Sequence, residues 1–311
     1  RKDLAIIVGI LIILNGIISS AALTNGFVGY IQTLLPISNW LAIVGIVVLL
    51  ALLACWGIAE SVLAAAIVTI IEIGGLLLII WAGKESLSWN ILSDAALVPP
   101  MEAVAWGGIL AGSFLAFYAF IGFEDMVNVA EEVQNPRRVI PISIMLVLGI
   151  TTIIYVAVTL VAILSVPTSE LATNDAPLVL IYEKVMGQPG TVISLISITA
   201  LINGALIQII MASRVIYGMS KRGWLPTELG AVNKITRTPI RATLFISLII
   251  IVLALGFNIE VLASITSLVF LVISVLVNAS LFQLKRLGVS QPEAFTVPIW
   301  VPAGGFLISL T

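Results

Sequence analysis

Long runs of apolar residues, separated by shorter polar connections, dominate this chain. Nine such runs stand out, at about 4–32, 40–55, 60–82, 101–123, 140–166, 190–219, 240–256, 260–284 and 297–311. Most exceed the roughly 20 residues that a helix needs to cross about 30 Å of hydrocarbon. Helices are expected because an open sheet edge would leave unpaired backbone groups in lipid. The pattern predicts an all-α, polytopic membrane protein in which residues 1–311 form a single transmembrane domain.

Composition narrows the possible classes of function. The chain is 60% hydrophobic and 10% charged, whereas soluble domains average roughly 45–50% and about 25%. It has no histidine, a single cysteine (Cys55), and no acidic cluster that resembles a metal site. We therefore expect no metal, no cofactor and no enzymatic activity. The net charge of −2 gives no indication of a nucleic-acid partner.

The positions of the basic residues predict an orientation. Of the 14 lysines and arginines, only Lys84 and Lys184 fall at connections on one side of the predicted spans. The others precede the run 4–32 or lie at the connections after 101–123, 190–219 and 260–284. The positive-inside rule places those segments in the cytoplasm of a multi-pass cell-membrane protein. The connection 167–189 is then external, and could be either a lid over a vestibule or a passive cap.

The end of the run 101–123 permits two interpretations. The run is long enough to cross the bilayer, which would place Glu124 at the cytoplasmic surface. The polar residues that follow are still compatible with a helix as far as Pro136, which would be too long for one straight crossing. A break at Gly122 inside the membrane would instead present backbone dipoles to a substrate, as broken helices do in transporters.

Glu72 is a carboxylate near the middle of the run 60–82. A charge at that depth is costly, so such an acid is normally paired, protonated or functional. Glu72 is therefore a candidate proton carrier. The alternative is a structural acid that accepts a hydrogen bond from a neighbouring helix.

Several motifs, in order along the chain, resemble those of the amino acid–polyamine–organocation (APC) permeases. They are Phe120-Ile-Gly-Phe-Glu with Glu131-Glu132, Asn135-Pro-Arg-Arg138 and Ile140-Pro141, and also Ser213–Pro226, Thr238–Ala242, Trp56–Ser61 and Phe295–Trp300. The resemblance implies a LeuT-like fold of two inverted five-helix repeats, with substrate held between two broken helices. Residues 1–82 would be the last three helices of the first repeat, and 101–286 the whole second repeat. Residues 297–311 would begin the family's eleventh helix, so we expect an incomplete inverted repeat.

The same resemblance implies a secondary transporter of amino acids or related amines that works by alternating access. Its partners would be a small-molecule substrate, a proton and the lipid bilayer; the oligomeric state is not indicated. Glu72 aligns where several proton-coupled relatives carry a lysine, a cation that a carboxylate cannot imitate. Glu72 would either carry the proton itself or pair with a cationic group, such as that of the substrate. The run 190–219 also lacks the adjacent Ser/Thr pair of sodium-coupled relatives. We therefore favour proton coupling or exchange, by symport or antiport, over sodium symport. The alternatives are a polyamine or organocation permease and, less favoured, a channel or sensor.

Site residues follow from matched positions. Ile121, Gly122 and Phe123 would form the unwound joint, whose carbonyls accept hydrogen bonds from a substrate ammonium. Tyr118 would close over the ligand, although it could equally be a packing residue. Glu124 would couple protonation to gating.

Three further polar sets carry two interpretations each. Asn203 and Gln208 align with a substrate-facing stretch, or form interhelical hydrogen bonds. The pairs Glu131-Glu132 and Arg137-Arg138 could form salt bridges at a cytoplasmic gate. They could equally be a solvated helix face and orientation anchors.

Overall fold

The computed structural model describes residues 2–57, 62–87, 101–128, 130, 133–288 and 295–310, and every regular element in these ranges is helical. The prediction of an all-α protein is therefore confirmed. The elements are α1 (Lys2–Gln32), α2 (Asn39–Trp56), α3 (Val62–Ala82), η1 (Lys84–Leu87), α5 (Ala103–Phe117), η3 (Tyr118–Phe120), α6 (Asp125–Asn128), α7 (Pro136–Ser165), α8 (Thr168–Leu171), α9 (Pro177–Met186), α10 (Thr191–Lys221), α11 (Ile240–Gly256), α12 (Ile259–Arg286) and α13 (Trp300–Leu310). Within the described residues, six helices are long and apolar enough to cross a membrane.

Most of these helices begin and end close to the boundaries of the predicted apolar runs. One difference is that α7 begins at Pro136, four residues before the run that predicts it. Proline is favoured in the first helical turn because its missing N–H would have no partner there. Asn135 precedes it with φ of 51°, a left-handed conformation that turns the chain into the helix.

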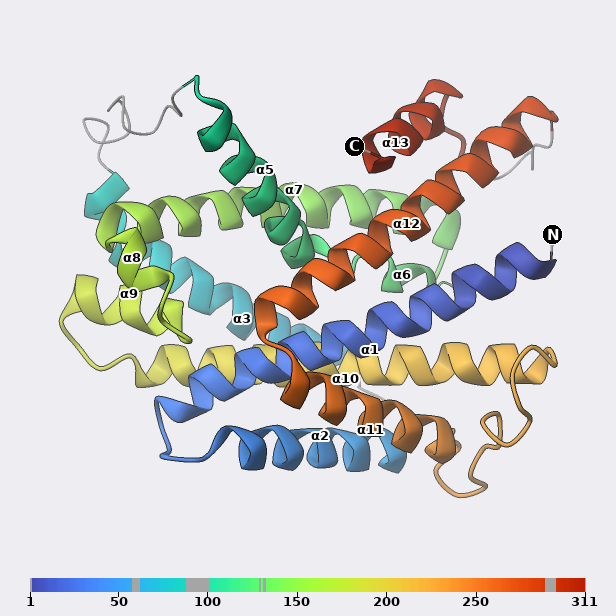
Figure 1. Ribbon diagram of the computed structural model, residues 1–311, viewed down its shortest axis with the longest axis horizontal. Helices are drawn as coiled ribbons and strands as arrows, with labels where there is room; N and C mark the ends of the chain where they lie inside the picture. The colour runs from blue at the N-terminus through green and yellow to red at the C-terminus, as the bar shows by residue number, and fades with distance from the viewer. Residues whose placement is uncertain are drawn as a thin grey trace.

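Four helices form the main core. The long helix α10 crosses α1, while α2 and α11 run next to each other below them (Figure 1). The largest buried side chains in this cluster include Ile17, Val47, Ile209 and Ile246, one from each helix. Small residues such as Ala22 and Ala205 lie among them, which lets the helix backbones approach closely. This core is the scaffold against which the remaining helices are positioned.

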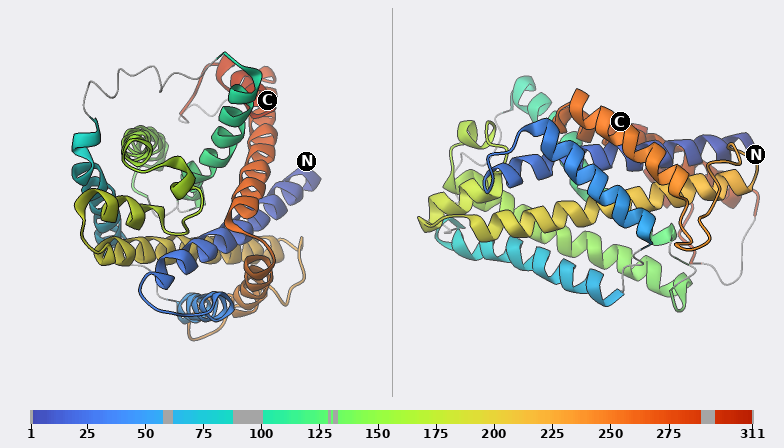
Figure 2. Two further views of the ribbon diagram at one scale, coloured as in Figure 1. Left: turned by 60° about the vertical axis from the view of Figure 1, so that its left-hand side comes forward. Right: turned by 90° about the horizontal axis from the view of Figure 1, so that it is seen from below.

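A second group of helices surrounds α7. In the view along its axis, α3 lies on one side of α7, whereas α5 and α12 lie on the other (Figure 2, left). The helix α12 also contacts α1 and α13. The elements that carry the predicted site, from α5 through α6, therefore reach the core from its α12 side.

The basic residues gather at one end of the molecule. The N-terminus, the start of α7, the α10–α11 connection and the end of α12 all lie on the right of Figure 1. The elements η1, α8 and α9, which carry Lys84 and Lys184, lie on the left. The helix directions are thus consistent with the charge pattern of the sequence, while the assignment of the basic end to the cytoplasm stays a prediction.

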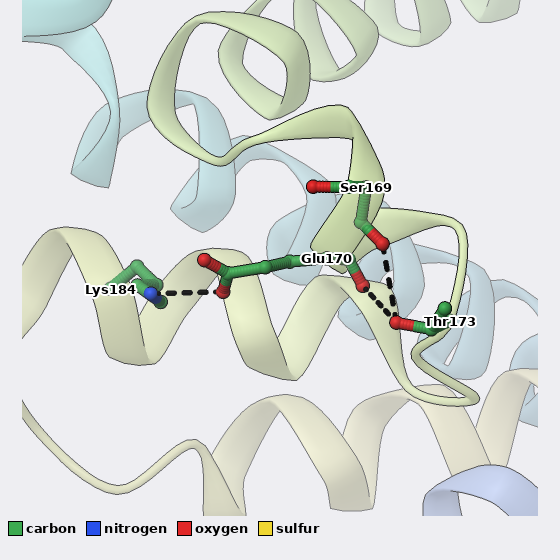
Figure 3. A network of polar contacts seen from close by, with 4 residues as sticks. All are labelled: Ser169, Glu170, Thr173 and Lys184. Carbon is green, nitrogen blue, oxygen red and sulfur yellow. Dashed lines mark hydrogen bonds and ion pairs between the residues drawn. The ribbon is translucent and has the colours of Figure 1, made fainter.

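The predicted external connection is a folded segment. Val179 and Ile181 of α9 are buried against Tyr30 and Val161, which belong to α1 and α7. In α8, the Glu170 carboxylate pairs with the Lys184 ammonium at 2.9 Å, and the Thr173 hydroxyl donates to the carbonyls of Ser169 and Glu170 (Figure 3). The segment is therefore docked on the helix ends, and whether it also acts as a lid stays open.

Candidate functional site

The span predicted at 101–123 is broken. The helix α5 ends at Phe117 and tightens into η3, after which Ile121 is extended, with φ of −69° and ψ of 137°. Gly122 follows with φ of +127°, a conformation that residues with a Cβ rarely adopt. The short helix α6 then begins at Asp125. The helix is therefore interrupted at Ile121 and Gly122, while the position of this break inside the membrane stays a prediction.

A cavity of about 520 Å³ lies beside the break. Its volume is within the range of roughly 300–1,000 Å³ that is typical of small-molecule sites. It is lined by residues of α1, η3, the joint, α6, α7 and α10: Ser19, Leu23, Tyr118, Ala119, Ile121, Gly122, Asp125, Met126, Tyr155, Gly204, Ile207, Gln208 and Met211. The lining is mostly apolar, with a few polar groups that could orient a ligand.

The backbone of the joint has a carbonyl that lacks a hydrogen-bond donor. Four carbonyls in this stretch accept hydrogen bonds: those of Tyr118, Ala119, Gly122 and Phe123. Within the described residues, no donor reaches the carbonyl of Ile121. Ile121 also lines the cavity. Its carbonyl is therefore available to a donor such as an ammonium group, because a carbonyl oxygen is a strong acceptor.

Tyr118 joins the cavity wall to α1. Its hydroxyl donates to the Ser19 carbonyl at 3.2 Å and lies 3.4 Å from the Ser19 hydroxyl. The ring lines the cavity and also packs on the main core. Tyr118 therefore both lines the cavity and packs on the core, and its role over a bound ligand stays a prediction.

Phe123 is held away from the cavity. Its ring meets the ring of Phe270 of α12 edge to face at 5.9 Å between centroids, and Phe117 packs on the same ring at 5.7 Å. Phe123 is not among the residues that line the cavity. It therefore anchors the joint to α12, and only its backbone belongs to the predicted substrate-binding stretch.

Glu124 folds back onto the joint. Its Oε2 accepts a hydrogen bond of 2.7 Å from the Gly122 backbone N–H. The side chain is partly buried and does not line the cavity. Glu124 thus stabilises the unwound conformation of the glycine, which is compatible with a gating role through the backbone.

Asp125, which the sequence analysis did not select, faces the cavity. The Nε2 of Gln208 donates to its Oδ2 at 2.9 Å, and both residues line the cavity. Two consecutive acids point about 100° apart if the helical rotation continues, so only one of them can face a given surface. The sequence holds the pair Glu124-Asp125 but no pattern that says which acid faces inward.

Glu72 and Asn203 meet at the contact between α3 and α10. The Asn203 Nδ2 donates to Glu72 Oε1 at 3.1 Å. Asn203 and Gln208 were predicted to share a substrate-facing stretch. Gln208 lines the cavity, whereas Asn203 does not and is instead bonded to Glu72. Tyr155 of α7 connects the two sites, since it interacts electrostatically with Glu72 and donates to the Ala119 carbonyl of the cavity wall. For both Glu72 and Asn203, an interhelical hydrogen bond was one of the two interpretations of the sequence. The roles of these two residues in transport stay predictions.

The predicted cytoplasmic gate is described only in part. Glu131 and Glu132 lie outside the described residues. Arg137 and Arg138 are exposed at the start of α7, close to the joint in sequence. The gate and the anchor interpretations therefore both remain predictions.

Comparison with known proteins identifies the family. A model of the amino acid permease family matches residues 1–311. The chain is 29% identical to the branched-chain amino acid permease BcaP of Bacillus subtilis over 64% of this chain and 43% of that protein. It is 30% identical to the vacuolar cationic amino acid transporter 2 of Arabidopsis thaliana, over 75% of this chain and 37% of that protein. It is 25% identical to the methylthioribose transporter of B. subtilis, over 95% of this chain and 67% of that protein.

The chain spans less than half the length of the first two of these relatives. The family match covers every helix described above and includes the broken span with its cavity. It agrees with the ordered motifs and with the apolar helices of a multi-pass membrane protein. The chain belongs to the amino acid permease family, within the APC superfamily.

Proposed function

We propose that this protein is a secondary transporter that moves amino acids or related amines across the cell membrane by alternating access. The observation that carries the proposal is the break at Gly122 beside a cavity of about 520 Å³. The carbonyls inside a continuous helix accept hydrogen bonds, whereas at the break the carbonyl of Ile121, a residue that lines the cavity, has no donor among the described residues. The basic end of the molecule would face the cytoplasm.

The relatives support the transporter class more firmly than any one substrate. Their names include a branched-chain amino acid permease, a cationic amino acid transporter and a methylthioribose transporter. The cavity favours an amine-bearing ligand, because an ammonium can donate to the Ile121 carbonyl and lie against the ring of Tyr118. Such a cation–π contact would contribute about 0.5–2 kcal/mol. A polyamine or organocation permease is the second candidate, and the carboxylate at the cavity wall favours it to the same degree.

Uptake into proteoliposomes tests the proposal. The full-length protein is reconstituted, and radiolabelled amino acids compete with each of the twenty amino acids and with polyamines, with and without a proton gradient. We expect saturable uptake of at least one amino acid or amine, together with counterflow when unlabelled substrate is inside. A substrate-independent ionic conductance without counterflow would instead indicate a channel and refute the proposal.

We propose further that transport is coupled to protons, or to exchange, and that Glu72 carries the proton. Its hydrogen bond from Asn203, and its proximity to Tyr155 at the cavity wall, link the acid to the site. Glu72→Gln should abolish the pH dependence of uptake. The matched control is Asn203→Leu, which removes the hydrogen bond but keeps the carboxyl group, and should keep a pH dependence. Unchanged pH dependence in Glu72→Gln would remove Glu72 from the coupling mechanism.

A further inference from the structure

We propose that a second cavity, at the end of the molecule opposite the basic residues, binds the zwitterionic head group of an amino acid. The ligand carboxylate would lie at Lys84 and the ligand ammonium at Glu85. This inference rests on the proposed transport function for its role, because a site at the predicted external helix ends would receive a substrate before it reaches the broken span. Its own basis is the set of charges that line the second cavity.

The second cavity is separate from the one beside Gly122. Its volume is about 460 Å³, and the two cavities share no lining residue. It lies where η1 meets the ends of α3, α7 and α9, and the elements η1 and α9 are on the left of Figure 1. A volume of this size is within the range of roughly 300–1,000 Å³ that is typical of small-molecule sites.

One of the two lysines in this lining is already paired. Lys184 Nζ lies 2.9 Å from Glu170 Oε2, an ion pair that is drawn in Figure 3. Lys84 instead lies over the ring of Trp81, at 5.4 Å from the ring centroid. Within the described residues, Lys84 has no carboxylate partner. Its ammonium is therefore the cation in this lining that can pair with a ligand carboxylate.

Glu85 adds a carboxylate to the same lining. In the part of the chain that the structure describes, its side chain forms neither an ion pair nor a hydrogen bond. Successive residues of a 3₁₀ helix point about 120° apart, so the side chains of Lys84 and Glu85 diverge. An ammonium and a carboxylate that are not paired with each other thus line one cavity.

Hydroxyl groups and apolar side chains complete the lining. Ser165 Oγ donates to Ser86 Oγ at 2.8 Å, which leaves the Ser86 hydroxyl hydrogen for an acceptor on a ligand. Apolar surface comes from α7 and α9, through Leu164, Val185 and Met186. The cavity therefore offers a partner to each part of an amino acid: its carboxylate, its ammonium and an apolar side chain.

The two charges favour a zwitterion over a ligand of one charge. A simple carboxylate or a phosphate would meet the like charge of Glu85, and a simple amine would meet that of Lys84. Like charges placed side by side are unfavourable, whereas opposite charges attract. A zwitterion pairs with both residues and leaves the ion pair of Lys184 with Glu170 intact.

Protection of an introduced cysteine measures occupancy of this cavity alone. Ala82 lines the cavity, and Ala82→Cys adds a single sulfur atom to its wall. The native cysteines, Cys55 among them, are first replaced by serine. The purified full-length protein in detergent is then treated with a methanethiosulfonate reagent, in the presence of leucine, 4-methylpentanoate or 3-methylbutylamine. The second compound lacks the ammonium of leucine and the third lacks its carboxylate. We expect leucine to slow the modification at least fivefold, and each analogue to slow it less than twofold.

Substitutions of the two charged residues are tested in the same background. Lys84→Gln and Glu85→Gln should each remove the protection by leucine. Lys84→Arg retains the charge and should retain the protection, which separates loss of charge from loss of folding. The matched control is Glu102→Gln, because Glu102 is an exposed acid outside the lining, and it should behave as the parent.

Three results would overturn the inference: no protection by leucine, equal protection by either analogue, or full protection in Lys84→Gln or Glu85→Gln. Loss of protection in Glu102→Gln would show that the effect is not local to the cavity, and would overturn it as well. If uptake persists, these results leave the transport proposal intact. A full-length protein that takes up no amino acid or amine refutes the transport proposal itself, even where leucine protects the cysteine.

Discussion

Replacing Gly122 with alanine tests whether the break in the span depends on the glycine. Gly122 has φ of +127°, and a Cβ built there would meet no atom within 4 Å. Steric crowding therefore cannot explain an effect of the substitution, and only the backbone conformation can. Gly112 in α5 is the matched control, because its Cβ would also meet nothing within 4 Å and its φ is helical.

The expected difference in unfolding free energy follows from comparing Gly122→Ala with Gly112→Ala. Both lose conformational entropy in the unfolded chain, which stabilises the folded state by about 0.4–1 kcal/mol. Only Gly122→Ala adds backbone strain, which costs on the order of 1–3 kcal/mol. The free energies of unfolding should therefore differ by about 1–3 kcal/mol, or a factor of about 5 to 150 in the equilibrium constant. Alternatively, the joint of Gly122→Ala relieves the strain by becoming helical.

Thermal unfolding in detergent and uptake in proteoliposomes measure the two consequences. Gly112→Ala should be at least as stable as the wild type and should transport normally. Gly122→Ala should unfold at a lower temperature, or remain stable with strongly reduced uptake if the joint becomes helical. If Gly122→Ala matched Gly112→Ala in both assays, the positive φ at Gly122 would have no part in folding or transport, and the reasoning would be wrong.

Two further predictions concern the external segment. A Cβ at Gly29 would lie 2.9 Å from the carbonyl carbon of Asp175, so Gly29→Ala should lower the unfolding free energy by about 1–3 kcal/mol through overpacking. In α2, Gly45→Ala has open space and should instead stabilise the protein by about 0.5–1 kcal/mol; equal thermal stabilities would contradict this. Lys184→Ala removes an ion pair whose side chains are 45% and 44% exposed, so its cost should be below about 1 kcal/mol at physiological salt; a larger shift in the unfolding midpoint would show that the pair anchors α8 to α9.

The extent to which the sequence could predict the site depended on the kind of residue. The break at Gly122 could be anticipated, because a glycine followed by acids, in a stretch too long for one straight crossing, favours a bend in the span. The choice between Glu124 and Asp125 could not be anticipated, since both are carboxylates that follow Gly122 within three residues. The return of the Glu124 carboxylate to the Gly122 N–H depends on the turn itself, and so does the inward direction of Asp125.

A similar limit applies to the pairs between helices. Glu72, Asn203 and Gln208 stood out as polar groups in apolar runs, but nothing in their spacing says which of them meet. The packing of α3 on α10 brings Glu72 to Asn203, and Asp125 at the start of α6 meets Gln208 of α10. The side-chain contact of Phe123 could not be predicted either. Its position in the motif indicated the substrate site, but its ring packs against Phe270 of α12.

Hydrophobicity and helix length are local properties, so the sequence by itself determined the membrane class, the helical spans and the segregation of basic residues. Its ordered motifs also determined the family. Side-chain direction and contact partners depend on how the helices cross, and these are properties of the tertiary structure alone. The structure therefore decided that the span is broken at Gly122, that a cavity lies beside the break, and that Asp125 is the acid that faces it.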